Sequence, residues 1–165
     1  IGSYNLDNVL AAITVGLHFG VTADQVCHAI ENYEPTNNRS ELVKTGSNTL
    51  IVDAYNANPT SMAAALDSFG QIATQLPKMA ILGDMRELGE VSEAEHQKVV
   101  DTLKAKGLND VWLVGEEFGK TRCDFHKYNN VEEVKQAIAS YKPCGKCILI
   151  KGSNGTKLFE LPELL

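Results

Sequence analysis

Three polar loops contain the residues best suited to ligand chemistry. In the first, DAYNANP at residues 53–59, the carboxylate of Asp53 sits at a solvent-facing strand end, where it can accept hydrogen bonds from ribose hydroxyls. Asn56 adds an amide that both donates and accepts. The other two loops are GDMRELGE at 83–90 and KGSNGTK at 151–157. Each loop follows a short apolar run, and ligands of open α/β sheets bind beyond the carboxyl ends of the strands. We therefore expect the three loops to form one site.

Two segments resemble phosphate-binding loops. GEEFGKT, at residues 115–121, has only three residues between its glycines, one fewer than a P-loop needs to wrap a phosphate. We expect a plain loop with an exposed lysine there. KGSNGTK has its threonine and lysine in reversed order, so a phosphate cradle and a substrate-contacting loop both stay open, and the second is favoured.

Histidine and cysteine provide no recognisable catalytic or metal site. His18 and His28 fall on helices as structural residues, whereas His96 lies in the first turn of a helix and could face the GDMRELGE loop. The CGKC pair at 144–147 could belong to a zinc or redox site. It lacks a second ligand pair, however, and leads into a strand, so we interpret it as small residues at a strand entrance.

The periodicity of apolar residues divides the chain into two parts. Helical spacing from Leu6 to Leu17, with Asn5 as cap, and a capping box formed by Thr22 and Gln25 predict a helical pair. A turn-rich linker follows at residues 34–41. The remainder alternates: strands are predicted at 41–44, 49–52, 79–82, 111–114 and 148–150, and helices after Asn58, from a Ser92–Glu95 capping box to Lys106, after Asn130, and at 156–165.

This order predicts an α/β fold, a Rossmann-like, mostly parallel sheet with helices on both faces. We assign residues 1–38 to the helical tail of a neighbouring domain plus linker, and residues 39–165 to the α/β domain. Because the chain lacks an initial Met, we expect it to be a piece of a longer protein.

The composition narrows the possible partners. The 165 residues carry a formal charge of −6, which gives no support to a nucleic-acid surface. No apolar run approaches the roughly 20 residues of a membrane span, and the N-terminus lacks the basic region of a signal peptide. Four cysteines are compatible with reduced thiols, and we expect a cytoplasmic protein.

The combination of DAYNANPTSM, LGDMRELGE with Ser92 and His96 after it, and a late IKGS resembles the carboxyl-terminal domain of the Mur ligases. Within that family, it is most similar to the branch that adds D-alanyl-D-alanine to UDP-N-acetylmuramoyl-tripeptide during peptidoglycan synthesis. GSYNLDNVLAA, at residues 2–12, resembles the helix that closes the family's central ATPase domain. KGSN stands where KGSR is common in the family.

The resemblance implies ATP-driven amide synthesis through an acyl phosphate. ATP and Mg²⁺ would be bound mainly by a central domain that is absent here, so it implies no catalytic residue and no metal ligand in this chain, and no activity of the chain alone. Another Mur ligase, a folylpolyglutamate-type ligase and a stand-alone nucleotide-binding module remain alternatives. The implied nucleotide contacts are Arg39 to adenosine, Asp53 to ribose, and Asn56 to the nucleotide or its terminal phosphate. The residues implied to face the incoming dipeptide are Asp84, Met85, Glu87, Lys151 and Ser153.

Overall fold

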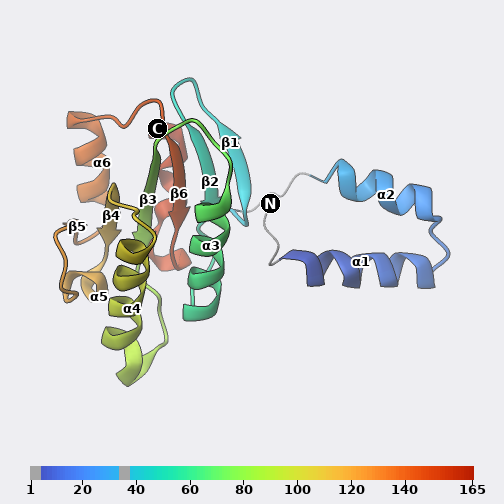
Figure 1. The fold of residues 1–165 in the computed structure, drawn as a ribbon, viewed down its shortest axis with the longest axis horizontal. Helices are drawn as coiled ribbons and strands as arrows, with labels where there is room; N and C mark the ends of the chain where they lie inside the picture. Colours follow the sequence, from blue (N-terminus) through green and yellow to red (C-terminus); the bar gives the residue numbers. More distant parts are fainter. Residues whose placement is uncertain (1–4, 34–37) are drawn as a thin grey trace.

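A six-stranded sheet forms the centre of the computed structural model, which describes residues 5–33 and 38–165 (Figure 1). The strand order is β1-β2-β6-β3-β4-β5, in which β1 is antiparallel to β2 and every other neighbouring pair is parallel. The strands are β1 (Glu41–Lys44), β2 (Thr49–Asp53), β3 (Lys78–Gly83), β4 (Val111–Val114), β5 (His126–Tyr128) and β6 (Cys147–Lys151). The predicted mostly parallel α/β architecture is confirmed.

Helices cover both faces of this sheet, as predicted. Helices α3 (Pro59–Gln71), α4 (Ser92–Ala105) and the short α5 (Glu116–Gly119) pack their apolar residues on one face, and α6 (Val131–Ser140) packs on the other. Because successive strand side chains point to opposite faces, neighbours such as Ile81 and Leu82 enter different cores. The sheet is thus held rigidly from both sides, and its strand ends are fixed in position.

Two of the predicted helix starts are capped as expected. Asn58 Oδ1 accepts from the backbone N–H of Ser61 at 2.8 Å ahead of α3, and Asn130 Oδ1 accepts from the N–H of Glu133 at 3.1 Å ahead of α6. The predicted Ser92–Glu95 capping box is wrong. A 3-10 turn, η2 (Gly89–Val91), runs directly into α4, so Ser92 is already helical and its hydroxyl is available for another partner.

The expected terminal helix at 156–165 is also wrong. The segment forms three 3-10 turns, η3 (Asn154–Thr156), η4 (Leu158–Glu160) and η5 (Pro162–Leu164). Lys157 adopts a left-handed conformation (φ 56°), which ends the first turn, and Pro162 has no N–H to continue the second as a helix. Strand β5 was not predicted, because HKY is short and largely exposed.

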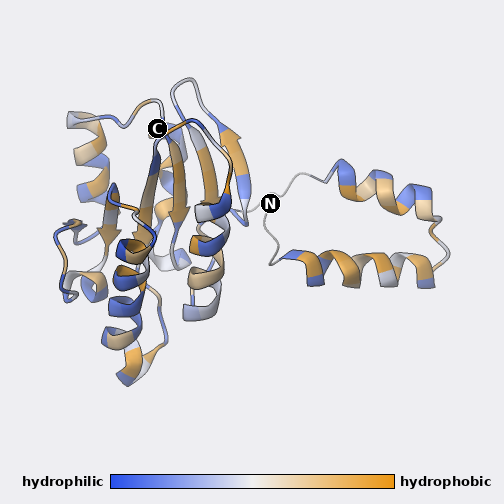
Figure 2. Cartoon of the chain, in the orientation of Figure 1, coloured by the Kyte–Doolittle hydropathy of each residue, from blue (hydrophilic) through white to orange (hydrophobic). Residues whose placement is uncertain are grey.

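The two N-terminal helices are α1 (Leu6–His18) and α2 (Ala23–Glu31), drawn away from the sheet in Figure 1. The Thr22–Gln25 capping box is present, whereas Asn5 makes no side-chain cap. Neither helix buries a residue, although α1 is apolar along much of its length (Figure 2). Among the described residues, no helix is both long and apolar enough to cross a membrane. The expected linker at 34–41 lies partly outside the described residues.

Candidate functional site

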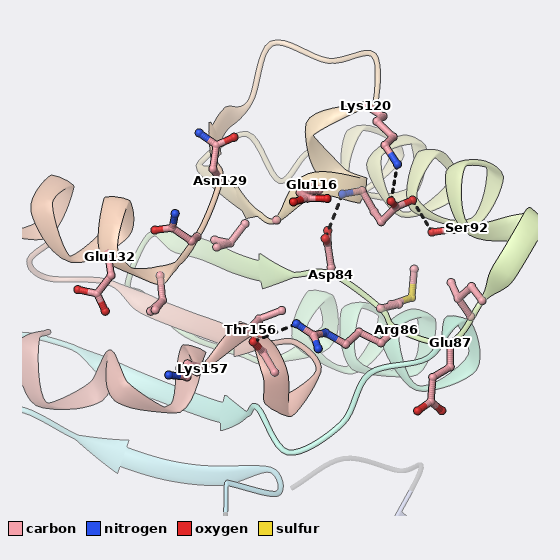
Figure 3. A pocket seen from close by; sticks show the side chains of 18 of the residues that line it. Asp84, Arg86, Glu87, Ser92, Glu116, Lys120, Asn129, Glu132, Thr156 and Lys157 are labelled. Atoms are coloured by element: carbon pink, nitrogen blue, oxygen red, sulfur yellow. Dashed lines mark hydrogen bonds and ion pairs between the residues drawn. The ribbon is translucent and has the colours of Figure 1, made fainter.

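A cavity of about 1030 Å³ opens where strands β3 and β4 end (Figure 3). Its walls come from the loops that follow β3, β4, β5 and β6, so a cavity lies at the edge of the sheet where we expected a ligand site. The lining is rich in charge of both signs. The charged residues are Asp84, Arg86, Glu87, Glu116, Glu117, Lys120, Glu132 and Lys157.

Hydrogen bonds join the loops that follow β3 and β6. The backbone N–H of Ser153 donates to Asp84 O at 3.2 Å, and Ser153 Oγ accepts from the N–H of Arg86 at 3.1 Å. The Arg86 guanidinium donates to Gly155 O at 3.3 Å. Among the described residues, that carbonyl is the only protein partner of the guanidinium, which has several further N–H donors. Arg86 therefore lies against the cavity wall with donors to spare for a ligand (Figure 3).

Asp84 uses its carboxylate to hold the start of α5. Its Oδ1 accepts from the N–H of Phe118 at 2.9 Å and its Oδ2 from the N–H of Glu117 at 3.0 Å. The close approach requires a residue without a side chain at Gly115, which has φ 126° and where a Cβ would collide with this carboxylate. Asp84 therefore lines the cavity, but its main role is to hold the loop after β4 in position.

We expect Gly115→Ala to lower the free energy of unfolding by roughly 1–3 kcal/mol, because its backbone conformation strains any L side chain and Asp84 would have to move. Chemical denaturation of the chain measures this. Gly119→Ala is the control, since Gly119 ends the helix that follows Gly115 and a Cβ there meets nothing within 4 Å. Equal effects of the two changes would show that the Asp84–Gly115 approach does not matter.

His96 faces the loop after β3, as the sequence suggested. The ring is fully buried, its Nε2 accepts from the N–H of Met85 at 3.0 Å, and its Nδ1 lies 2.7 Å from Ser92 O. Ser92 Oγ in turn donates to Glu117 Oε2 at 2.7 Å. Hydrogen bonds from Lys120 first, and from Ser92 second, hold the pKa of Glu117 below its ordinary value.

A second cluster lies at the end of β2. Lys151, only 1% exposed, places Nζ 2.6 Å from Asp53 Oδ2 and 3.2 Å from Asn56 O. The other oxygen of Asp53 accepts from the N–H of Ser40 at 3.3 Å. A lysine buried this deeply is stable when its charge is paired and hydrogen-bonded. Asp53 is therefore half of a largely buried ion pair, not a free solvent-facing carboxylate.

Other residues near this ion pair are exposed at the surface. The Arg39 guanidinium stacks over the ring of Tyr55 at 4.0 Å. Asn56 is exposed, and its Oδ1 accepts from the N–H of Ala57 at 2.8 Å, so its NH₂ group has no partner among the described residues.

The structure thus divides the sequence-predicted residues between two clusters on one sheet edge. Asp84, Met85 and Glu87 line the cavity, although the Met85 side chain is 1% exposed and packs in the core. Ser153 is 4% exposed and does not line the cavity. Arg39, Asp53, Asn56 and Lys151 form the second cluster. Because Asp53 and Lys151 are paired in register on β2 and β6, the β6 loop connects the two clusters.

Sequence reasoning missed several cavity residues. Arg86 lies within the GDMRELGE loop, which we expected to contribute to the site. Its positive charge was the signal that could have identified it as a ligand-binding residue. Glu116 and Lys120 belong to GEEFGKT, where the expected plain loop is wrong because the segment forms the short helix α5, and both residues line the cavity. Lys120 pairs with Glu117. Lys157 lines the cavity from the β6 loop.

The CGKC segment has a structural role. Cys144 is exposed, whereas Cys147 begins β6 and packs in the core, where burial raises the pKa of its thiol. A thiol protonated in this way is a poor nucleophile and metal ligand. Among the described residues, no group of three or more His, Cys, Asp or Glu side chains is placed to hold a metal ion.

Comparisons with known proteins identify the family to which the chain belongs. The family model described as "Mur ligase, glutamate ligase domain" matches residues 38–154. The UDP-N-acetylmuramoyl-tripeptide–D-alanyl-D-alanine ligase of Bacillus subtilis is 32% identical over 173 residues, covering 98% of this chain and 37% of that protein.

Solved structures of MurF proteins resemble this chain along nearly its whole length. MurF from Acinetobacter baumannii superposes with a TM-score of 0.78 at 27% identity, over 98% of this chain and 38% of that one. MurF from Thermotoga maritima in complex with ADP has a TM-score of 0.81 at 20% identity, over 99% of this chain and 38% of that one, a likeness of fold alone. The chain therefore spans little more than a third of the length of these relatives.

Proposed function

The chain belongs to the Mur ligase family, and from this premise we propose that it serves as the carboxyl-terminal domain of an ATP-dependent ligase that adds D-alanyl-D-alanine to UDP-N-acetylmuramoyl-tripeptide. The observation that carries the proposal is the identity with a ligase of that name along 98% of the chain. The two clusters at one sheet edge supply the chemistry that such a domain needs, a nucleotide side and an acceptor side.

The cluster at the end of β2 is the nucleotide side. Arg39, stacked on Tyr55, contributes a flat cationic surface suited to the adenosine. Asp53 accepts from the ribose hydroxyls while Lys151 neutralises its charge, and the Asn56 amide donates to the nucleotide or its terminal phosphate. Buried Lys151 thereby acts through Asp53 and not through the ligand.

The cavity is the acceptor side, where the loop at 84–87 and residues 155–157 of the β6 loop face the dipeptide. A dipeptide is a zwitterion, so its two ends need opposite charges. Arg86 and Lys157 suit the carboxylate, and Glu87 and Glu116 suit the ammonium group. Ser153 contributes by holding Arg86 in place. The residues present therefore fit a small zwitterionic acceptor.

Phosphoryl transfer belongs to a central domain in this proposal. That domain supplies the phosphate-binding loop and the Mg²⁺ ligands, and bound ATP supplies the phosphoryl group that activates the tripeptide carboxylate. This chain closes over the nucleotide and excludes water from the acyl phosphate. Residues 1–38 belong with the central domain, to which the exposed apolar residues of α1 offer a packing face. We propose the cytoplasm as its location, where ATP and reduced thiols are found.

We expect the chain by itself to release no phosphate from ATP and to bind ADP only weakly, because half of the nucleotide site lies on the central domain. Calorimetry with ADP and a phosphate-release assay measure both. Sub-micromolar ADP affinity would favour a stand-alone nucleotide-binding module, and turnover by the isolated chain would contradict the proposed division of labour.

A further inference from the structure

We propose that His96 is a positioning residue for the acceptor cavity. As a neutral ring with its proton on Nδ1, it fixes the Met85 peptide and thereby the direction in which Arg86 enters the cavity. The consequence for catalysis rests on the proposed function, whereas the ring state and its coupling to the loop do not.

The hydrogen bonds of His96 define its tautomer. Nδ1 lies 2.7 Å from Ser92 O, and a carbonyl oxygen can only accept, so Nδ1 carries the proton. Nε2 lies 3.0 Å from the backbone nitrogen of Met85, and an N–H can only donate, so Nε2 is unprotonated. The ring is fully buried and packs edge-on against Phe118, with 4.7 Å between ring centroids. Its orientation is therefore fixed on every side.

The His96 ring influences the cavity through the peptide groups of Met85 and Arg86, which are consecutive in the chain. His96 on α4 holds the N–H of Met85, and Ser153 after β6 holds the N–H of Arg86. Asp84, just before them, is held by the N–H groups of α5. The three residues 84–86 are thus anchored to three different elements. Among these anchors, His96 is the one whose hydrogen-bonding capacity changes with a single proton.

Protonation of His96 would disturb this arrangement. The imidazolium would carry a proton on Nε2 as well, so this N–H would point at the N–H of Met85. Two donors cannot form a hydrogen bond with each other. The charged groups facing the ring are Asp84 from the β3 loop, with Oδ1 3.7 Å from Nε2, and Glu117 from α5, which is already bonded to Ser92 and Lys120. The imidazolium would therefore draw Asp84 away from the Phe118 N–H. Both changes loosen the segment that carries Arg86.

The first test uses this chain alone, by nuclear magnetic resonance. Nitrogen spectra should show His96 with Nδ1 protonated and Nε2 bare at neutral pH. On acidification, the amide signals of Met85 and Arg86 should move together, and this movement should vanish in His96→Gln. His126→Gln, at an exposed histidine on β5, is the control and should leave the movement of both amide signals intact. A ring protonated on Nε2, or amides indifferent to His96, would overturn the inference.

The second test uses the complete ligase. His96→Leu fills the space but offers no acceptor, and we expect it to raise the KM for D-alanyl-D-alanine about tenfold while the KM for ATP changes little. His96→Gln, whose side-chain oxygen can accept from the Met85 N–H, should recover most of the loss. Equal impairment of both variants would contradict the positioning role. If the wild-type ligase does not use the dipeptide at all, the proposed function is wrong. The nitrogen spectra of the chain alone would still show which nitrogen of the His96 ring carries the proton.

Discussion

Asp53→Ala should lower the free energy of unfolding of this chain by about 3–5 kcal/mol, the cost typical of breaking a buried ion pair from one side. The reason lies in Lys151, which is 1% exposed and would lose its counter-charge, retaining only the carbonyl oxygen of Asn56 as a partner. Urea denaturation followed by circular dichroism measures the change. The result would also show that this strand end is part of the folded core.

The chain offers a matched control for that prediction. Lys146 and Asp110 form an ion pair whose side chains are 19% and 37% exposed, so Asp110→Ala should cost at most about 1 kcal/mol. Adding Lys151→Met to Asp53→Ala should restore much of the lost stability, because it removes the orphaned charge. If Asp53→Ala and Asp110→Ala destabilise equally, the buried pair does not have the role assigned to it.

Arg86→Ala in the complete ligase should raise the KM for D-alanyl-D-alanine by roughly one to two decades. A charge-assisted hydrogen bond to a carboxylate is worth about 1.5–3 kcal/mol. The guanidinium has Gly155 O as its only protein partner among the described residues, so its remaining donors are available to the dipeptide. Steady-state kinetics at saturating ATP and tripeptide give the value.

Arg122→Ala is the control for Arg86→Ala, because Arg122 is exposed and does not line the cavity. It should leave the dipeptide KM unchanged. A large rise in the KM for ATP, with the dipeptide KM intact, would move Arg86 from the acceptor side to the nucleotide side and contradict the assignment.

The sequence predicted those elements whose signals are local. The caps at Asn58 and Asn130 depend on residues three positions away, and the buried strands are continuous apolar runs. The failures have equally physical causes. The terminal segment fails as a helix because Lys157 turns left-handed, and Ser92 fails as a cap because a 3-10 turn already precedes it.

For the site, the sequence predicted the three loops but not how their side chains pair. Asp53 and Lys151 are 98 positions apart, and their contact follows from the register of β2 beside β6. The commitment of Asp84 to α5 likewise depends on two strands ending side by side. Local patterns therefore identify which loops meet, whereas the sheet decides which residues face the ligand and which hold the others in place.

If this chain completes a ligase for a D-alanyl dipeptide, as we propose, the complete protein should use that dipeptide as its acceptor. The most direct test supplies the complete protein with ATP, Mg²⁺ and UDP-N-acetylmuramoyl-tripeptide, and offers D-alanyl-D-alanine in competition with single amino acids. We predict one product, the tripeptide extended by the dipeptide, formed with stoichiometric release of phosphate. A product extended by a single amino acid, or no product despite ATP binding, would contradict the account.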